Sequence, residues 1–130
     1  MQERRAAEGP AVSKQRAKGT AWETAWVNYL ESEGVSANRT RFSSAHGDVE
    51  TPGFPALCWE GKNVERLALG DWLAQATRSA DRTLRWPVVF HKRRGKGVAE
   101  AYVTMPAWVM VKILQSWGRV PVPSDFKVAL

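Results

Sequence analysis

The stretch that decides the fold is Gly47-Asp48-Val49-Glu50-Thr51-Pro52-Gly53-Phe54-Pro55-Ala56-Leu57-Cys58-Trp59-Glu60-Gly61-Lys62. Its middle, Thr51-Pro52-Gly53, has the composition of a turn. The apolar run that follows, residues 56–59, is typical of a central strand and leads directly into Glu60-Gly61-Lys62. We therefore expect residues 48–50 and the apolar run to pair as a hairpin, which returns Asp48 to the side of Glu60.

Upstream of the hairpin, the sequence predicts one helix and one strand. Thr20 and Glu23 have the Thr-x-x-Glu spacing of a capping box, which predicts a helix that begins at Thr20. The apolar stripe of this helix is Trp22, Trp26, Tyr29 and Leu30. Gly34 follows as a helix-ending residue. Residues 35–42 alternate loosely and predict a first strand, and residues 43–47 form a small polar break.

Downstream of the hairpin, the pattern returns to helices and strands. A second amphipathic helix carries Leu69, Trp72, Leu73, Ala76 and Ala80. Residues 87–90 and 99–105 predict two strands, and Pro106 is placed to open a final helix. The order α-β-β-β-α-β-β-α gives an antiparallel meander followed by a helical crossover. It predicts an α/β domain with one mixed sheet flanked by helices.

Length and composition favour one folded domain. The chain has 130 residues, of which 44% are hydrophobic. Residues 1–17 predict a flexible basic arm, and residues 18–130 predict the single domain. No apolar run approaches the roughly 20 residues that span a bilayer, and residues 1–18 lack a stretch of signal-peptide type, so we expect a cytosolic protein with no membrane partner. The single cysteine, Cys58, excludes an internal disulfide, and no cysteine–histidine cluster suggests zinc.

Positive charge favours a polyanionic partner, nucleic acid first. Lysine and arginine total 19 against 13 acids, which gives a net charge of +6. The basic loop, His91-Lys92-Arg93-Arg94-Gly95-Lys96-Gly97, holds four of these cations together with two glycines. We expect Lys92, Arg93, Arg94 and Lys96 to contact DNA phosphates, although the same composition suits a solubilising loop. Arg39 and Arg41 alternate on one strand and are expected to line the same groove.

Asp48, Glu60 and Lys62 have the chemistry of a phosphodiester-hydrolysing site. Alternate residues of a strand share a face, so Glu60 and Lys62 project together. Carboxylate oxygens hold a hard cation such as Mg²⁺, which lowers the pKa of a bound water, and a lysine offsets negative charge on the phosphate. The rival interpretation is a strand whose polar residues face solvent. The apolar run directly before Glu60 favours the site.

Five segments carry a resemblance to known proteins. They are Lys18-Gly19-Thr20-Ala21-Trp22-Glu23, Arg41-Phe42-Ser43-Ser44, Gly47-Asp48, Trp59-Glu60-Gly61-Lys62-Asn63 and the basic loop. On them the chain resembles the PD-(D/E)XK, or restriction-endonuclease-like, nuclease superfamily, and within it the archaeal-type Holliday-junction resolvases and their phage relatives. The sequence departs from the superfamily pattern at Gly47, which replaces a proline, and at Gly61, where an apolar residue is usual. We expect Gly61 to loosen the strand.

The resemblance implies a nuclease that resolves four-way DNA junctions as a homodimer. It places the catalytic Mg²⁺, or Mn²⁺ in its stead, on Asp48 and Glu60, and it makes Lys62 the assistant of the attacking water. It also places Glu23 near the metal, against the rival interpretation that Glu23 only completes the capping box. A phage-encoded member acts in the cytoplasm of its host.

Other residues take secondary roles in this interpretation. Ser43 or Ser44 is expected to contact the scissile region or to cap a turn, and Lys18 to bind DNA. Gln75 is expected near the site, or else on an exposed helix face. The tryptophans, seven in all, predict core or dimer-interface positions. Two other functions stay open: a related nuclease for nicking, repair or restriction, and a catalytically silent DNA-binding protein.

Overall fold

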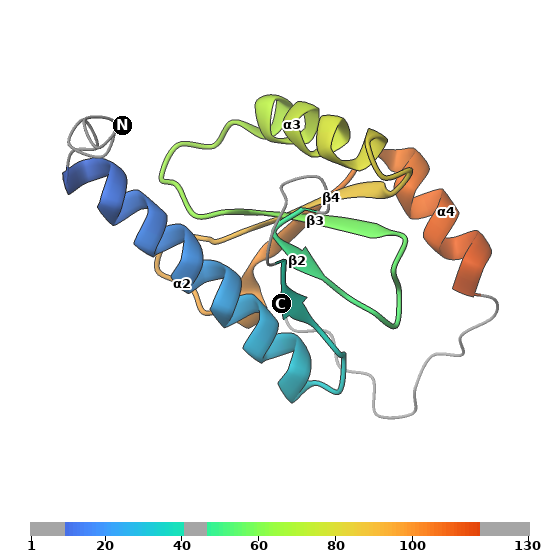
Figure 1. Cartoon of the computed structure of the whole chain (residues 1–130), viewed down its shortest axis with the longest axis horizontal. Helices are drawn as coiled ribbons and strands as arrows, with labels where there is room; N and C mark the ends of the chain where they lie inside the picture. Colours follow the sequence, from blue (N-terminus) through green and yellow to red (C-terminus); the bar gives the residue numbers. More distant parts are fainter. Residues whose placement is uncertain (1–9, 41–46, 118–130) are drawn as a thin grey trace, which may run out of the picture.

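The computed structural model describes residues 10–40 and 47–117 and has the expected order of elements (Figure 1). The order is α2 (Pro10–Ser32), β1 (Asn38–Arg39), β2 (Val49–Glu50), β3 (Leu57–Lys62), α3 (Leu69–Asp81), β4 (Trp86–His91), the 3-10 turn η2 (Val98–Glu100), β5 (Tyr102–Thr104) and α4 (Ala107–Trp117). The predicted α/β class is therefore confirmed. None of the helices in this part of the chain is long and apolar enough to cross a membrane.

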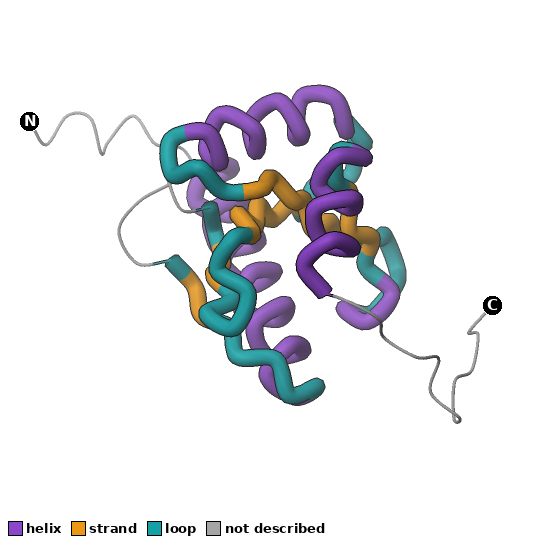
Figure 2. Tube along the Cα trace, turned by 90° about the vertical axis from the view of Figure 1, so that its right-hand side faces the viewer, coloured by secondary structure: helices purple, strands orange, loops and turns teal. Residues whose placement is uncertain are grey.

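The strands form one mixed sheet in the order β1-β2-β3-β4-β5. β1, β2 and β3 are antiparallel, and Val49 lies opposite Trp59. β3 and β4 are parallel and are joined through α3, while β5 returns antiparallel to β4. This confirms the expected meander with a helical crossover. Figure 2 shows α3 on one side of the strands and α2 on the other.

The first helix is longer than predicted. It runs from Pro10 to Ser32, so Thr20 lies inside it, and the predicted capping box is wrong. Residues 14–18 contain lysine, glutamine, arginine and alanine, which are strong helix formers, and Pro10 suits a first helical turn. Residues 10–17 of the predicted arm are thus helical, whereas residues 1–9 lie outside the described residues.

The predicted end of this helix is confirmed. Gly34 has a φ of 83°, the left-handed conformation that favours glycine. Its N–H donates to the Glu31 carbonyl at 3.0 Å, and the Val35 N–H donates to the Leu30 carbonyl at 2.8 Å. These two bonds are those of a Schellman motif, and they turn the chain towards β1.

Two predicted strands are shorter in the structure. β1 contains only Asn38 and Arg39 of the predicted residues 35–42, of which residues 41 and 42 lie outside the described part. The predicted strand 99–105 is reduced to Tyr102–Thr104 because the chain first makes the turn η2. The Gly97 N–H donates to the Glu100 carboxylate at 3.2 Å there, which favours the turn over an extended start.

The main core lies between the sheet and α2. Trp26 stacks on Phe90 with ring centroids 5.1 Å apart, and Trp59 meets the same ring edge-on at 6.2 Å. α4 contributes Val109 and Ile113 to this cluster. A Cβ on Gly61 would lie 2.6 Å from the Phe90 ring, so the glycine makes room for that ring. β3 still pairs with β4 through Gly61 and Phe90, contrary to the loosening expected at Gly61.

Candidate functional site

The two polar residues at the end of β3 project towards α3. The Lys62 Nζ donates to the Gln75 Oε1 of that helix at 2.6 Å. Glu60 is hydrogen-bonded by Ser79, one turn further along α3. The intervening residue, Gly61, instead faces Phe90 and the α2 side of the sheet. Glu60 and Lys62 therefore share a face, as their spacing predicts.

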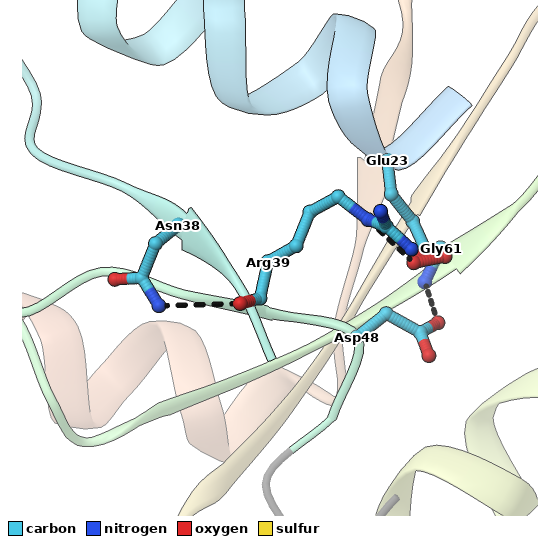
Figure 3. A network of polar contacts seen from close by, with 5 residues as sticks. All are labelled: Glu23, Asn38, Arg39, Asp48 and Gly61. Atoms are coloured by element: carbon cyan, nitrogen blue, oxygen red, sulfur yellow. Dashed lines mark hydrogen bonds and ion pairs between the residues drawn. The ribbon is translucent and has the colours of Figure 1, made fainter. Parts of the chain in front are cut away.

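Asp48 is fixed beside β3 through the backbone. Its N–H donates to the Trp59 carbonyl at 2.6 Å. Its Oδ2 accepts the Gly61 N–H at 2.8 Å (Figure 3). Because β2 pairs with β3 only as far as Trp59, this carboxylate provides the acceptor that the next N–H of β3 needs. The Asp48 carboxylate therefore lies alongside Gly61, the residue that separates Glu60 from Lys62 on β3.

Gly47 explains why no proline precedes Asp48 in this chain. Its φ is 79°, a value that the proline ring forbids. A Cβ on Gly47 would also lie 2.6 Å from the Trp59 carbonyl oxygen. Glycine at position 47 is therefore what lets the chain pass close to β3 and position Asp48.

Glu60 is buried, and its negative charge is repelled by that of Asp48. Only 4% of Glu60 is exposed to solvent. Burial and then the charge of Asp48 raise the pKa of Glu60 to about 8, although the Ser79 hydrogen bond and the Lys62 charge lower it. The direct contact between the Asp48 and Glu60 side chains raises the pKa of Glu60 further.

Glu23 joins this cluster from α2. Its pKa is raised, first by burial and next by the charge of Asp48, while Arg39 lowers it. Arg39 Nε lies 3.5 Å from Glu23 Oε1, a pairing drawn beside Asp48 and Gly61 in Figure 3. Asp48, just before β2, thus lies near one carboxylate on β3 and near another on α2. Since Thr20 lies inside the helix, the capping-box role of Glu23 is excluded.

The donor set fits a hard divalent cation. Across residues 10–40 and 47–117, no three histidine, cysteine, aspartate or glutamate side chains form a preassembled metal site. Mg²⁺ does not require one, because it commonly binds one or two carboxylates and retains several waters. Two neighbouring carboxylates repel one another, and a divalent cation bound between them would remove this repulsion. Asp48 and Glu60 are therefore suitable ligands.

The structure gathers the basic loop and Lys18 around a neighbouring cavity. This cavity, about 660 Å³, is lined in part by Lys18, Lys92, Arg93 and Arg94. Lys96 and Lys92 line a second cavity of about 290 Å³ between the loop and α2. His91, which opens the loop, is buried and its Nε2 lies 2.8 Å from the Thr104 Oγ1, so it acts as a strand-end structural residue. Burial lowers the pKa of His91.

Three predicted site residues cannot be placed, and one important residue was missed. Arg41, Ser43 and Ser44 lie outside the described residues. Ser79 was not predicted, although it bonds Glu60. The signal was available, because Gln75 and Ser79 are four residues apart and therefore lie on one face of a helix.

No protein-family model and no curated protein matches this sequence. The assignment of a function therefore rests on the residues themselves and on the resemblance that their motifs carry.

Proposed function

We propose that the chain is a Mg²⁺-dependent endodeoxyribonuclease with a restriction-endonuclease-like fold, and that its substrate is branched DNA such as a four-way junction. One observation carries this proposal. Asp48 accepts the Gly61 N–H, and the charges of both Asp48 and Lys62 act on the buried Glu60, so two carboxylates and one ammonium group lie near one another beside β3. These three groups suit metal-assisted hydrolysis of a phosphodiester.

Each side chain has a defined task in this proposal. Asp48 and Glu60 would hold the cation, which when bound would polarise the phosphate and lower the pKa of a bound water. Ser79 orients Glu60, and Gln75 holds Lys62 by its Nζ. Lys62 then offers its remaining N–H donors to the attacking water and to a phosphate oxygen. Glu23, linked to Arg39, adds a third carboxylate at the margin of the site.

The remaining charge and the exposed apolar surface support the proposed partners. A net charge of +6 and the basic loop suit contacts with phosphates, which report the shape of DNA rather than its sequence. α4 exposes Met110, Leu114 and Trp117, which share one face of the helix, the last by 65%. Large apolar side chains exposed together on one helix face support a homodimer in which a second copy covers them.

Cleavage of a labelled synthetic four-way junction tests this function. Linear duplex, single-stranded and flap DNA serve as matched substrates, each with Mg²⁺ and with EDTA. We expect paired symmetric cuts that need Mg²⁺ and are confined to the junction. Mg²⁺-dependent cutting of the other substrates would keep the nuclease and discard the junction. Binding without any cutting would favour a silent DNA-binding protein.

A further inference from the structure

A cavity of about 660 Å³ lies at the carboxyl ends of the parallel strands β3 and β4. Its walls come from the connection between β3 and α3, from the start of α3, from the basic loop and from β5. The volume is within the range of roughly 300–1,000 Å³ that small-molecule sites occupy. None of the proposed catalytic carboxylates lines it, so its role is separate from metal binding.

One part of the cavity wall is apolar and unusually open to solvent. Val64, Leu67 and Tyr102 line the cavity and are 47%, 64% and 53% exposed. Leu69 and Trp72 continue the same wall at the start of α3. Exposed apolar side chains that converge on one hollow indicate that an occupant covers them.

The other part of the wall is cationic. Lys18, Lys92, Arg93 and Arg94 line the cavity, and Glu65 is its acidic residue. Four cations against one acid suit an anionic group such as a phosphate. A ligand with both an apolar ring and a phosphate fits the two parts together, whereas a free phosphate would leave the apolar wall uncovered.

Aromatic rings and a guanidinium provide the stacking surface. The Arg93 Cζ lies 4.3 Å from the Tyr102 ring centroid, a cation–π contact. His91 meets Tyr102 edge-on at 5.9 Å and lies 5.3 Å from Trp72, so the three rings are contiguous. Nucleobases stack on aromatic rings and on arginine planes, and they do so with little dependence on base identity.

We propose that this cavity binds one unpaired nucleotide of a DNA strand, with its base on Tyr102 and the apolar wall and its phosphate on the basic loop. The proposal rests on the proposed function in taking DNA as the ligand. His91 of the cavity lies opposite Lys62 in the parallel register, and neighbouring strands are about 5 Å apart. A DNA strand at the nuclease site can therefore reach the cavity.

This site would contribute to selection of branched DNA. Moving a base out of a duplex costs free energy, and the cost is smallest where the base is already unpaired. The cavity therefore favours a strand with an unpaired nucleotide next to the cleaved bond. It does so without reading the sequence.

Binding of a fluorescein-labelled oligothymidine and of an abasic oligomer of the same length tests the proposal by fluorescence anisotropy. Both carry the same phosphates, and EDTA prevents hydrolysis. We expect the full chain to bind the oligothymidine about tenfold more tightly. Tyr102→Leu should remove this preference, and Tyr102→Phe should keep it. Trp108→Leu, which changes an exposed aromatic residue of α4, is the control and should also keep it.

The proposal is overturned if the unchanged chain binds both oligomers equally, or if Tyr102→Leu retains the preference. Loss of the preference in Trp108→Leu would also overturn it, because the base would then lie elsewhere. Failure of the proposed function gives a different result: the base preference would remain in EDTA while no DNA is cut in Mg²⁺. Cutting without any base preference would leave the nuclease and remove the nucleotide site.

Discussion

The two faces of β3 differ sharply although they belong to the same six residues. Towards α2, Trp59 packs with Trp26 and Phe90, and Gly61 lies under the Phe90 ring. Towards α3, Glu60 is buried beside Asp48, and Lys62 bonds Gln75. One face is close-packed aromatic surface, and the other holds charged groups that burial disfavours.

This difference shows how a small domain can carry an unfavourable site. Burial of a carboxyl group next to another costs free energy, whereas burial of large aromatic rings is the main favourable contribution to folding. Because side chains alternate along a strand, both occur at neighbouring positions of β3. The aromatic face stabilises the backbone that the polar face uses.

Neutralising the carboxylates should have the largest effect, and it should separate the two faces. Glu60→Gln and Asp48→Asn should each reduce DNA cleavage on the order of a thousandfold, because a cation contributes several kcal/mol to the transition state. Cleavage rates of the labelled junction measure this loss. Circular dichroism and anisotropy should show an unchanged fold and retained DNA binding. Normal cutting by either variant would refute the site.

Filling the space at Gly61 should damage the aromatic face. The new methyl group of Gly61→Ala would lie 2.6 Å from the Phe90 ring, so the ring or the strand must shift. We expect a loss of about 1–3 kcal/mol in the free energy of unfolding, measured with urea. Gly70→Ala is the matched control, since nothing lies within 4 Å of its added Cβ. An equal effect of the two changes would contradict the close packing at Gly61.

Stability of the metal-free protein should depend on pH through Glu60. The pKa of Glu60 is about 8 in the folded chain and 4.5 ordinarily. The stabilisation that depends on protonated Glu60 is therefore fully present below about pH 4.5 and is lost as the pH rises through 8. In EDTA at about pH 4.5, Glu60→Gln should have the same melting temperature as the unchanged chain. At about pH 8 the variant should melt at a higher temperature, by on the order of 5 °C. Scanning calorimetry measures both.

Comparison with this variant isolates Glu60, because His91 and Glu23 titrate in both chains. Mg²⁺ should raise the melting temperature of the unchanged chain at the higher pH by binding the folded state, and should do so less in the variant. A pH dependence that is the same in both chains would show that Glu60 does not carry the buried proton.

The sequence predicted the strands and crossover that position the site, but not every local feature. The turn at Pro52 and Gly53 and the run into Glu60 were sufficient for the hairpin, because both signals are local. The predicted start of α2 was wrong, because the Thr-x-x-Glu spacing of Thr20 and Glu23 also occurs inside a longer helix and does not by itself mark a helix start. The ring over Gly61 and the Ser79 bond to Glu60 depend on contacts between distant segments, which no local pattern specifies.

The smallest expected effect concerns the basic loop. It separates residues that bind DNA from residues that take part in cleavage. Replacing Arg93 and Arg94 together by glutamine should weaken DNA binding for all sequences and reduce the slope of log K against log salt by about 2. Arg82→Gln, at the far end of α3, should leave the slope unchanged. Anisotropy over a range of salt concentrations measures both. Since these arginines contact phosphates and not the reacting group, the cleavage rate at saturating protein should change little. A large loss of that rate with an unchanged salt slope would move the loop from DNA binding into the chemistry of the site.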